Sequence, residues 1–286
     1  MKPAGRTGNG RRRGAPAASN GSSAGAAIGI FDSGIGGLTV LRAITELLPH
    51  EHLIYLGDTG RYPYGTKSAD TVRRYSLENA AFLADKGIKM LVVACNTSSA
   101  VALDSLREQL DVPVIGVIEP GATAAVTRTR NRKVGVIATE ATIASGAYTR
   151  VLKRLGSDLE IYTRACPLFV PLAEEGWVDN AVAQSTAALY LTSLKRSGID
   201  TLVLGCTHYP LLAEVIAGVM GPKVTLVDSA RTTAVAVRET LVRTGLTRRA
   251  GASSVSFFVT DTTDRFAKVA SRFIGQKVDS AVRIER

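Results

Sequence analysis

Two stretches of the sequence share one pattern, and this repeat most restricts the folds that the chain can adopt. Residues 91–100, LVVACNTSSA, and residues 201–210, TLVLGCTHYP, are apolar runs that end at Cys95 and Cys206. Apolar residues at helical spacing follow each run, and then comes another apolar run, VPVIGVIEP or KVTLVDSA. The pattern predicts a parallel α/β fold with each cysteine between the carboxyl end of a strand and the amino end of a helix. Such sheets place their chemistry there, and the helix dipole favours a thiolate.

Length and composition agree with this fold. The chain has 286 residues and 45% hydrophobic content, enough for one sizeable core or two small domains. Strands that alternate with helices indicate an α/β class with mostly parallel sheets. The three cysteines are too few for a disulfide framework and no secretory apolar segment precedes them, so we expect a cytoplasmic protein. No apolar run approaches the roughly 20 residues that a membrane span needs.

Half of the formal net charge of +10 lies at one end of the chain. Residues 1–27 contain five basic residues, no acidic residue and many Gly, Ala and Ser residues. This composition predicts a disordered tail. Weak binding of a polyanion by this basic arm is an alternative that the sequence leaves open.

The first strand and the turn that follows it invite comparison with a dinucleotide site. The strand is predicted over residues 26–31 and ends at Asp32, a glycine-rich turn follows, and Asp58 ends the next strand where a ribose-binding acid would stand. However, Thr39 occupies the place of the third glycine, and Asp32 would repel a pyrophosphate. A dinucleotide site is therefore disfavoured. The loop over residues 57–68 is either functional or an ordinary connection.

The second half of the chain echoes the first. Residues 133–148 begin with a glycine-bearing strand, VGVIAT, which parallels IGIFDS, and Thr139 stands near the place of Ser33. This order of parts indicates an internal duplication. Cys166 departs from the pattern because it precedes a proline among apolar residues, and we expect it to be a buried structural thiol.

These observations predict the domain organisation. Residues 1–27 form the basic tail, residues 28–117 and 229–286 form a discontinuous first α/β domain, and residues 118–228 form the second domain. The last segment is predicted to contain a helix, a strand and a final helix that have no counterpart in the other half. We therefore expect it to complete the first domain.

Three kinds of site chemistry compete for Cys95 and Cys206. A metal site with His208 would have an unusual one-residue gap and no obvious fourth ligand. A cysteine hydrolase with His208 as its base would leave one thiol without a role. In a two-base site, one thiolate removes a proton from a carbon and the other thiol delivers one to the opposite face, since thiols have a pKa of about 8.5 that local charge shifts either way. This scheme explains the repeat, with Asp32 and His208 assisting the two sulfurs.

Short polar groups near the cysteines suit a small zwitterion. They offer neutral donors to carboxylate and ammonium groups without a salt-bridging arginine. They are Ser33, Asn96, Thr97, Thr207 and the loop backbone around Tyr64 and Gly65.

Five motifs, in this order along the chain, resemble the cofactor-independent aspartate/glutamate racemase family, and glutamate-specific members in particular. They are DSGIGGLTVL, GDTGRYPYG, ACNTSSA, CPLFVPLAEEG and LGCTHYPLL. The resemblance covers nearly everything from residue 28 onward. It implies two α/β domains related by a pseudo-twofold, an active site in the cleft between them, and no cofactor or metal. It also implies interconversion of L- and D-glutamate, with D-glutamate used for peptidoglycan.

The resemblance also implies roles for individual residues. The paired catalytic cysteines would be Cys95, acting on the D-enantiomer, and Cys206, acting on the L-enantiomer. Asp32, His208 and Glu174 would assist them. The implied substrate contacts are Asp32, Ser33, Tyr64, Gly65, Asn96, Thr97, Thr139, Thr207 and His208. Gly60 and Ser98 depart from the family pattern, which has alanine there, and should affect loop stiffness more than chemistry.

Partners and rival functions complete the expectations. We expect glutamate as the substrate, a homodimer and no membrane association. The rivals are a sister racemase that acts on aspartate, a polyanion-binding protein that works through the tail, and a cysteine amidohydrolase.

Overall fold

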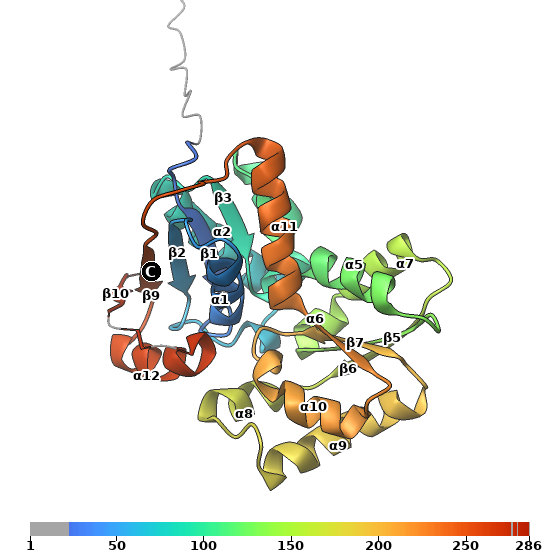
Figure 1. The fold of residues 1–286 in the computed structure, drawn as a ribbon. Coiled ribbons are helices and arrows are strands. Elements are labelled where there is room, and N and C mark those ends of the chain that lie inside the picture. The colour runs from blue at the N-terminus through green and yellow to red at the C-terminus, as the bar shows by residue number, and fades with distance from the viewer. Residues whose placement is uncertain (1–22, 276, 279, 286) are drawn as a thin grey trace, which may run out of the picture.

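The computed structural model describes residues 23–275, 277–278 and 280–285. Residues 1–22 of the basic tail, and with them its predicted disorder and polyanion binding, lie outside the described residues. Two sheets organise the rest of the chain (Figure 1).

Each sheet is parallel in every strand pair that the structure describes. The six-stranded sheet has the order β10-β9-β2-β1-β3-β4, and the four-stranded sheet has the order β6-β5-β7-β8. The predicted α/β class with parallel sheets is therefore confirmed. The strands are β1 Ile28–Asp32, β2 Leu53–Gly57, β3 Met90–Val93, β4 Val114–Gly116, β5 Lys133–Ala138, β6 Glu160–Ala165, β7 Thr201–Gly205, β8 Thr225–Asp228, β9 Val255–Val259 and β10 Val282–Arg283.

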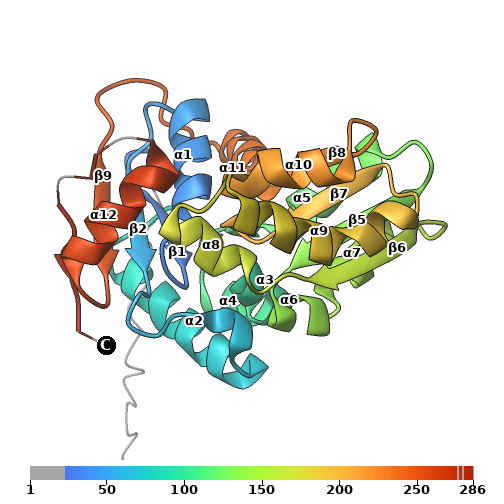
Figure 2. The same cartoon turned by 90° about the horizontal axis from the view of Figure 1, so that it is seen from below.

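Helices cover both faces of each sheet, and we call each sheet with its helices a lobe. In the first lobe, α1, α11 and α12 pack on one face and α2 and α4 on the other. In the second lobe, α8, α9 and α10 pack on one face and α5 and α7 on the other. Figure 2 shows the two lobes side by side from below. The helices are α1 Leu38–Leu47, α2 Ala69–Asp85, α3 Asn96–Val101, α4 Leu103–Gln109, α5 Ile118–Arg128, α6 Glu140–Ala144, α7 Ala147–Leu155, α8 Phe169–Glu175, α9 Ala181–Arg196, α10 Ala213–Met220, α11 Ser229–Thr244 and α12 Thr263–Ile274.

Burial on both faces explains why the central strands are almost uninterrupted apolar runs. All residues of β3, MLVV, and of β7, TLVLG, are buried. A strand that helices cover on both sides has no solvent face, so its sequence does not alternate.

The two sheets repeat one topology. The order β2-β1-β3-β4 in the first lobe matches β6-β5-β7-β8 in the second. Cys95 comes two residues after β3, and Cys206 directly follows the equivalent strand β7. This equivalence supports the internal duplication that the sequence indicates.

The prediction that a helix begins directly after Cys206 is wrong. Cys95 caps α3, but the chain after Cys206 first forms a 3₁₀ turn, η2 Tyr209–Leu212, and α10 begins only at Ala213. Pro210 has no amide hydrogen to donate to the carbonyl of Cys206, and the amide of Tyr209 bonds that carbonyl in a tighter turn instead. The helix predicted after Cys95 is also divided, into α3 and α4, around Ala102.

The C-terminal segment joins the first sheet. β9 pairs with β2, and the short β10, which the sequence analysis missed, pairs with β9. The exact domain boundaries stay a prediction. In the part of the chain that the structure describes, no helix combines the length and apolar character needed to span a membrane.

Candidate active site

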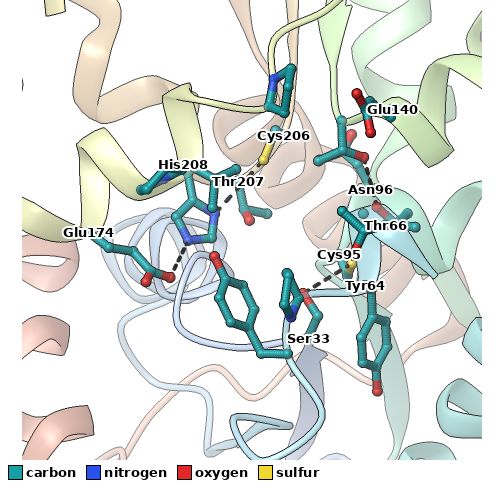
Figure 3. A pocket seen from close by; sticks show the side chains of 18 residues that line it. Ser33, Tyr64, Thr66, Cys95, Asn96, Glu140, Glu174, Cys206, Thr207 and His208 are labelled. Carbon is teal, nitrogen blue, oxygen red and sulfur yellow. Dashed lines mark hydrogen bonds and ion pairs between the residues drawn. The ribbon is translucent and has the colours of Figure 1, made fainter. Parts of the chain in front are cut away.

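One cavity of about 300 Å³ lies at the carboxyl ends of the central strands of both lobes, and both Cys95 and Cys206 line it (Figure 3). In sheets of this topology the crevice beside the first and third strands is the usual ligand site. The cavity brings together every predicted site residue except Asp32. Its lining is Ser33, Tyr62, Pro63, Tyr64, Gly65, Thr66, Cys95, Asn96, Thr97, Thr139, Glu140, Pro167, Val170, Pro171, Glu174, Cys206, Thr207 and His208.

Cys95 lies in a polar but buried setting at the amino end of α3. Its sulfur accepts from the amide of Ser98 at 3.5 Å and lies 3.6 Å from the hydroxyl of Ser33. Burial and then the charge of Asp32 raise the pKa of Cys95 to about 11, although the Ser98 amide lowers it. The amide at the helix end favours the thiolate of Cys95, as expected, but burial outweighs it and favours the thiol form.

Cys206 begins a chain of three side chains. Its sulfur is 3.8 Å from Nδ1 of His208, and Nε2 of His208 is 3.1 Å from Oε1 of Glu174 in α8. Burial lowers the pKa of His208, but the hydrogen bonds with Cys206 and Glu174 raise it by more than burial lowers it. The resulting pKa is about 10. The contacts with Cys206 and Glu174 therefore favour the protonated imidazolium form of His208.

Aromatic rings hold the imidazole of His208 from two sides. The ring of Tyr62 stacks on it at 6.3 Å between centroids, and the ring of Phe273 in α12 meets it edge-on at 5.3 Å. The sequence analysis missed both residues. Tyr62 lies in the GRYPYG motif and could have been found there, whereas Phe273 lies 65 positions from His208 and carries no sequence signal.

Asp32 lies behind the cavity lining. It is 1% exposed, and its Oδ2 accepts from the amide of Gly34 at 2.9 Å. Its Oδ1 has no hydrogen-bond partner among the described residues. Burial raises the pKa of Asp32, while the positive charge of His208 lowers it.

Neutral polar groups from both lobes surround the sulfurs. The hydroxyl of Tyr148 donates to Oδ1 of Asn96 at 2.7 Å, and the amide nitrogen of Asn96 has no partner among the described residues. The hydroxyls of Thr97, Thr139 and Thr142 lie within 3.2 Å of one another. The side chains of Tyr148 and Thr142 were not predicted, because only the fold brings them to the first lobe.

Three other predicted substrate contacts, Thr207, Tyr64 and Gly65, differ in which of their groups face the cavity. Thr207 lines the cavity, and its carbonyl accepts from the hydroxyl of Thr39 at 3.1 Å. Tyr64 turns its hydroxyl away from the sulfurs, so that it offers the cavity its backbone and ring (Figure 3). Gly65 lies against Thr139, and a Cβ atom on it would lie 2.8 Å from Cβ of Thr139. The loop can therefore approach the second lobe only with glycine there.

Two alternatives lose their support in the structure. Asp58 is fully buried and accepts hydrogen bonds from Arg61, Tyr64 and Thr260, so it serves the loop and not a ribose. Among the described residues, no cluster of three or more His, Cys, Asp and Glu side chains is arranged to hold a metal ion. Cys166 is fully buried outside the cavity lining, as expected of a structural thiol, and burial raises its pKa to about 12.

Comparison with known proteins identifies the family. Residues 28–237 match the Asp/Glu/hydantoin racemase family model. A glutamate racemase from Geobacter metallireducens is 56% identical over 259 residues, which cover 90% of this chain and 96% of that protein.

Solved structures agree. A glutamate racemase isoform from Bacillus anthracis superposes with a TM-score of 0.88 at 39% identity and covers 91% of this chain and 97% of its own. A glutamate racemase from Francisella tularensis in complex with D-glutamate has a TM-score of 0.86 at 36% identity, over 91% and 98% of the two chains. The chain therefore belongs to the Asp/Glu/hydantoin racemase family, as the resemblance of its motifs predicted.

Proposed function

We propose that this protein is a glutamate racemase that interconverts L- and D-glutamate by two-base proton transfer at Cα, with Cys95 and Cys206 as the two bases. The glutamate racemases from Geobacter metallireducens and Francisella tularensis support the substrate and the reaction. The observation that carries the proposal is the pair of thiols. They come from equivalent positions in two repeated lobes and line one cavity.

The two sulfurs have opposite electrostatic surroundings. The charge of Asp32 acts on Cys95 and favours its neutral form, whereas the imidazole of His208 lies 3.8 Å from Cys206 and in its protonated form can donate a hydrogen bond to a thiolate. A racemase needs one base and one acid at the same moment. The neighbours thus assign the base to Cys206 and the acid to Cys95 when L-glutamate binds.

In this direction the thiolate of Cys206 takes the Cα proton from L-glutamate. The electron pair left on Cα is delocalised into the α-carboxylate, and the thiol of Cys95 then delivers its proton to the opposite face. The product is D-glutamate, with Cys206 now a thiol and Cys95 a thiolate. Proton exchange with solvent or the reverse reaction restores the starting state.

The cavity suits a small dicarboxylate zwitterion. No lysine or arginine occurs in its lining as the described residues form it, so amide and hydroxyl donors would bind the carboxylates. A carboxylate bound by neutral donors keeps more of its own charge than one paired with a cation. We propose that the product serves peptidoglycan synthesis.

Deuterium transfer from solvent tests the two-base scheme. Pure L-glutamate in D₂O, without added metal or pyridoxal phosphate, should yield D-glutamate with one deuterium at Cα, while the remaining L-glutamate keeps its hydrogen at early times. The opposite thiol delivers a solvent-derived deuteron, and hence the label enters the product first. Equal early labelling of both enantiomers would contradict two separate bases.

Replacing each thiol tests the assignment of residues. Cys95→Ala and Cys206→Ala should each lower kcat by about 10³-fold or more, because each removes a positioned acid or base. Cys166→Ala is the matched control, since Cys166 is a buried thiol outside the cavity lining, and it should retain racemisation. Full activity of either cavity variant would refute the scheme. Conversion of aspartate but not glutamate by the wild type would instead favour the sister racemase.

A further inference from the structure

In the side-chain amide of Asn96, the oxygen has a hydrogen-bond partner and the nitrogen has none among the described residues. Its Oδ1 accepts a hydrogen bond of 2.7 Å from the hydroxyl of Tyr148. Its amide nitrogen has no partner among the described residues, although Asn96 is only 3% exposed and lines the cavity. A buried N–H group without a partner costs about 1–3 kcal/mol, so this nitrogen indicates that a bound ligand supplies an acceptor.

Packing determines where the hydroxyl of Tyr148 lies. Tyr148 is 2% exposed in α7, and its ring lies against the end of β7, where a Cβ atom on Gly205 would be 3.0 Å from Cε2 of the ring. The absence of a side chain at Gly205, directly before Cys206, thus leaves room for the ring. Burial, and then the charge of Cys206, raise the pKa of Tyr148, so its hydroxyl keeps its proton and acts as a donor.

A donor on Tyr148 decides which way the Asn96 amide points. If the amide were reversed, the Tyr148 oxygen could accept from its N–H group only by turning its own proton away from Asn96, and the carbonyl oxygen of Asn96 would face the cavity. The observed orientation leaves the N–H groups for the cavity. N–H groups bind carboxylate oxygens, whereas a carbonyl oxygen repels them.

We propose that Tyr148 is a positioning residue that locks the amide of Asn96 with its N–H groups towards the cavity, where they bind a carboxylate of the substrate. This inference rests on the proposed function and adds a residue of the second lobe to substrate recognition by the first. Asn96 lies in α3 of the first lobe and Tyr148 in α7 of the second lobe. The hydrogen bond that orients the amide therefore forms only when the two lobes are in contact.

Removing the hydroxyl alone tests this role. Tyr148→Phe should raise KM for both enantiomers of glutamate about fivefold to tenfold and change kcat less than twofold. Without the hydroxyl, part of the free energy of substrate binding is needed to orient the Asn96 amide. Calorimetric titration with D-glutamate should show the same loss of affinity. Tyr209→Phe is the matched control. That buried hydroxyl donates to the carbonyl of Cys166 at 2.9 Å outside the cavity lining, and its loss should leave KM unchanged.

A double-mutant cycle separates positioning from a general structural effect. If Tyr148 acts through Asn96, then Tyr148→Phe should change KM less than twofold in an Asn96→Ala background. Additive effects of the two substitutions, or a Tyr148→Phe variant with wild-type KM, would overturn the proposal.

A second variant keeps the test decisive if Tyr148→Phe does not fold. In Asn96→Asp, Tyr148 can still donate to one oxygen, but an oxygen replaces the N–H groups that face the cavity. Affinity for glutamate should fall at least tenfold, and wild-type affinity would overturn the proposal. Failure of the proposed function itself is recognised separately, because the wild-type protein would then neither racemise nor bind glutamate.

Discussion

At the scale of single residues, the two cysteines have the same chemistry but different neighbours. Cys95 has the burial and the nearby carboxylate of Asp32 that raise its pKa to about 11. Cys206 has the imidazole of His208, and the contacts of that ring with Cys206 and Glu174 favour its protonated form. A symmetric pair of thiols thus becomes an ordered acid and base through side chains that the two repeats do not share.

The raised pKa of His208 predicts a pH dependence of stability. Folding raises this pKa from about 6.5 to about 10, so the stability that it contributes is complete below pH 6.5 and is lost as pH rises through about 10. The free energy of unfolding should therefore fall between pH 7 and pH 9 in urea titrations. The pKa shift of Cys95, from 9.0 to about 11, acts in the same direction but mainly above this window.

Variants at the same site check that His208 is the cause. His208→Gln should flatten the change between pH 7 and pH 9. Glu174→Gln, which removes one of the hydrogen bonds that raise the pKa, should give an intermediate slope. A His208→Gln protein with the wild-type slope would show that another group is responsible.

At the scale of elements, the turns after parallel strands bring the two lobes into contact. The turn after β1 contains Gly36, and a Cβ atom there would lie 2.3 Å from Oγ1 of Thr207 and 2.4 Å from Nδ1 of His208. Those distances are too short for real atoms. Glycine in the first lobe therefore allows the turn after β7 to place His208 beside Cys206.

Gly36→Ala should consequently lower kcat/KM at least tenfold, because the added methyl group would displace Thr207 or His208 and misplaced catalytic groups lose rate steeply. Gly218→Ala in α10 is the control, since a Cβ atom there meets nothing within 4 Å. It should leave kcat/KM unchanged and support the helix slightly. Steady-state kinetics of both variants test the prediction, and wild-type kinetics for Gly36→Ala would contradict it.

At the scale of the whole molecule, the site exists only where both lobes meet. α12 belongs to the first lobe, yet Phe273 packs on His208, and Arg272 donates to the backbone carbonyl of Glu174 at the end of α8. The C-terminal helix thus contacts two members of the Cys206–His208–Glu174 chain, which comes from the second lobe. Its position should influence how accurately the imidazole faces the sulfur.

Arg272→Ala tests this link between the lobes. Loss of one hydrogen bond to the end of α8 is worth about 1 kcal/mol, so kcat/KM should fall about threefold to tenfold. Arg73→Ala, which removes an exposed arginine paired with Asp70 within α2, should stay within twofold of wild type. Equal effects of the two substitutions on kcat/KM would show that α12 does not support the site.

Much of this arrangement could be predicted from the sequence. Apolar runs that end at cysteines indicated parallel strands, and the carboxyl ends of such strands meet at one edge, so Cys95, Asn96, Cys206 and His208 were expected near one another. The order of parts in the two halves also indicated the duplication. These inferences rest on local periodicity and on a general rule of sheet geometry, both of which a sequence contains.

The tertiary structure alone decided how the groups act on one another. Tyr148, Phe273 and Arg272 reach the site from far along the chain, and the 3₁₀ turn at Pro210 replaced the helix expected after Cys206. Burial outweighed the expected effect of the helix end on the pKa of Cys95. Protonation and side-chain orientation depend on solvent exclusion and on atoms within a few ångströms, and packing between distant segments sets both.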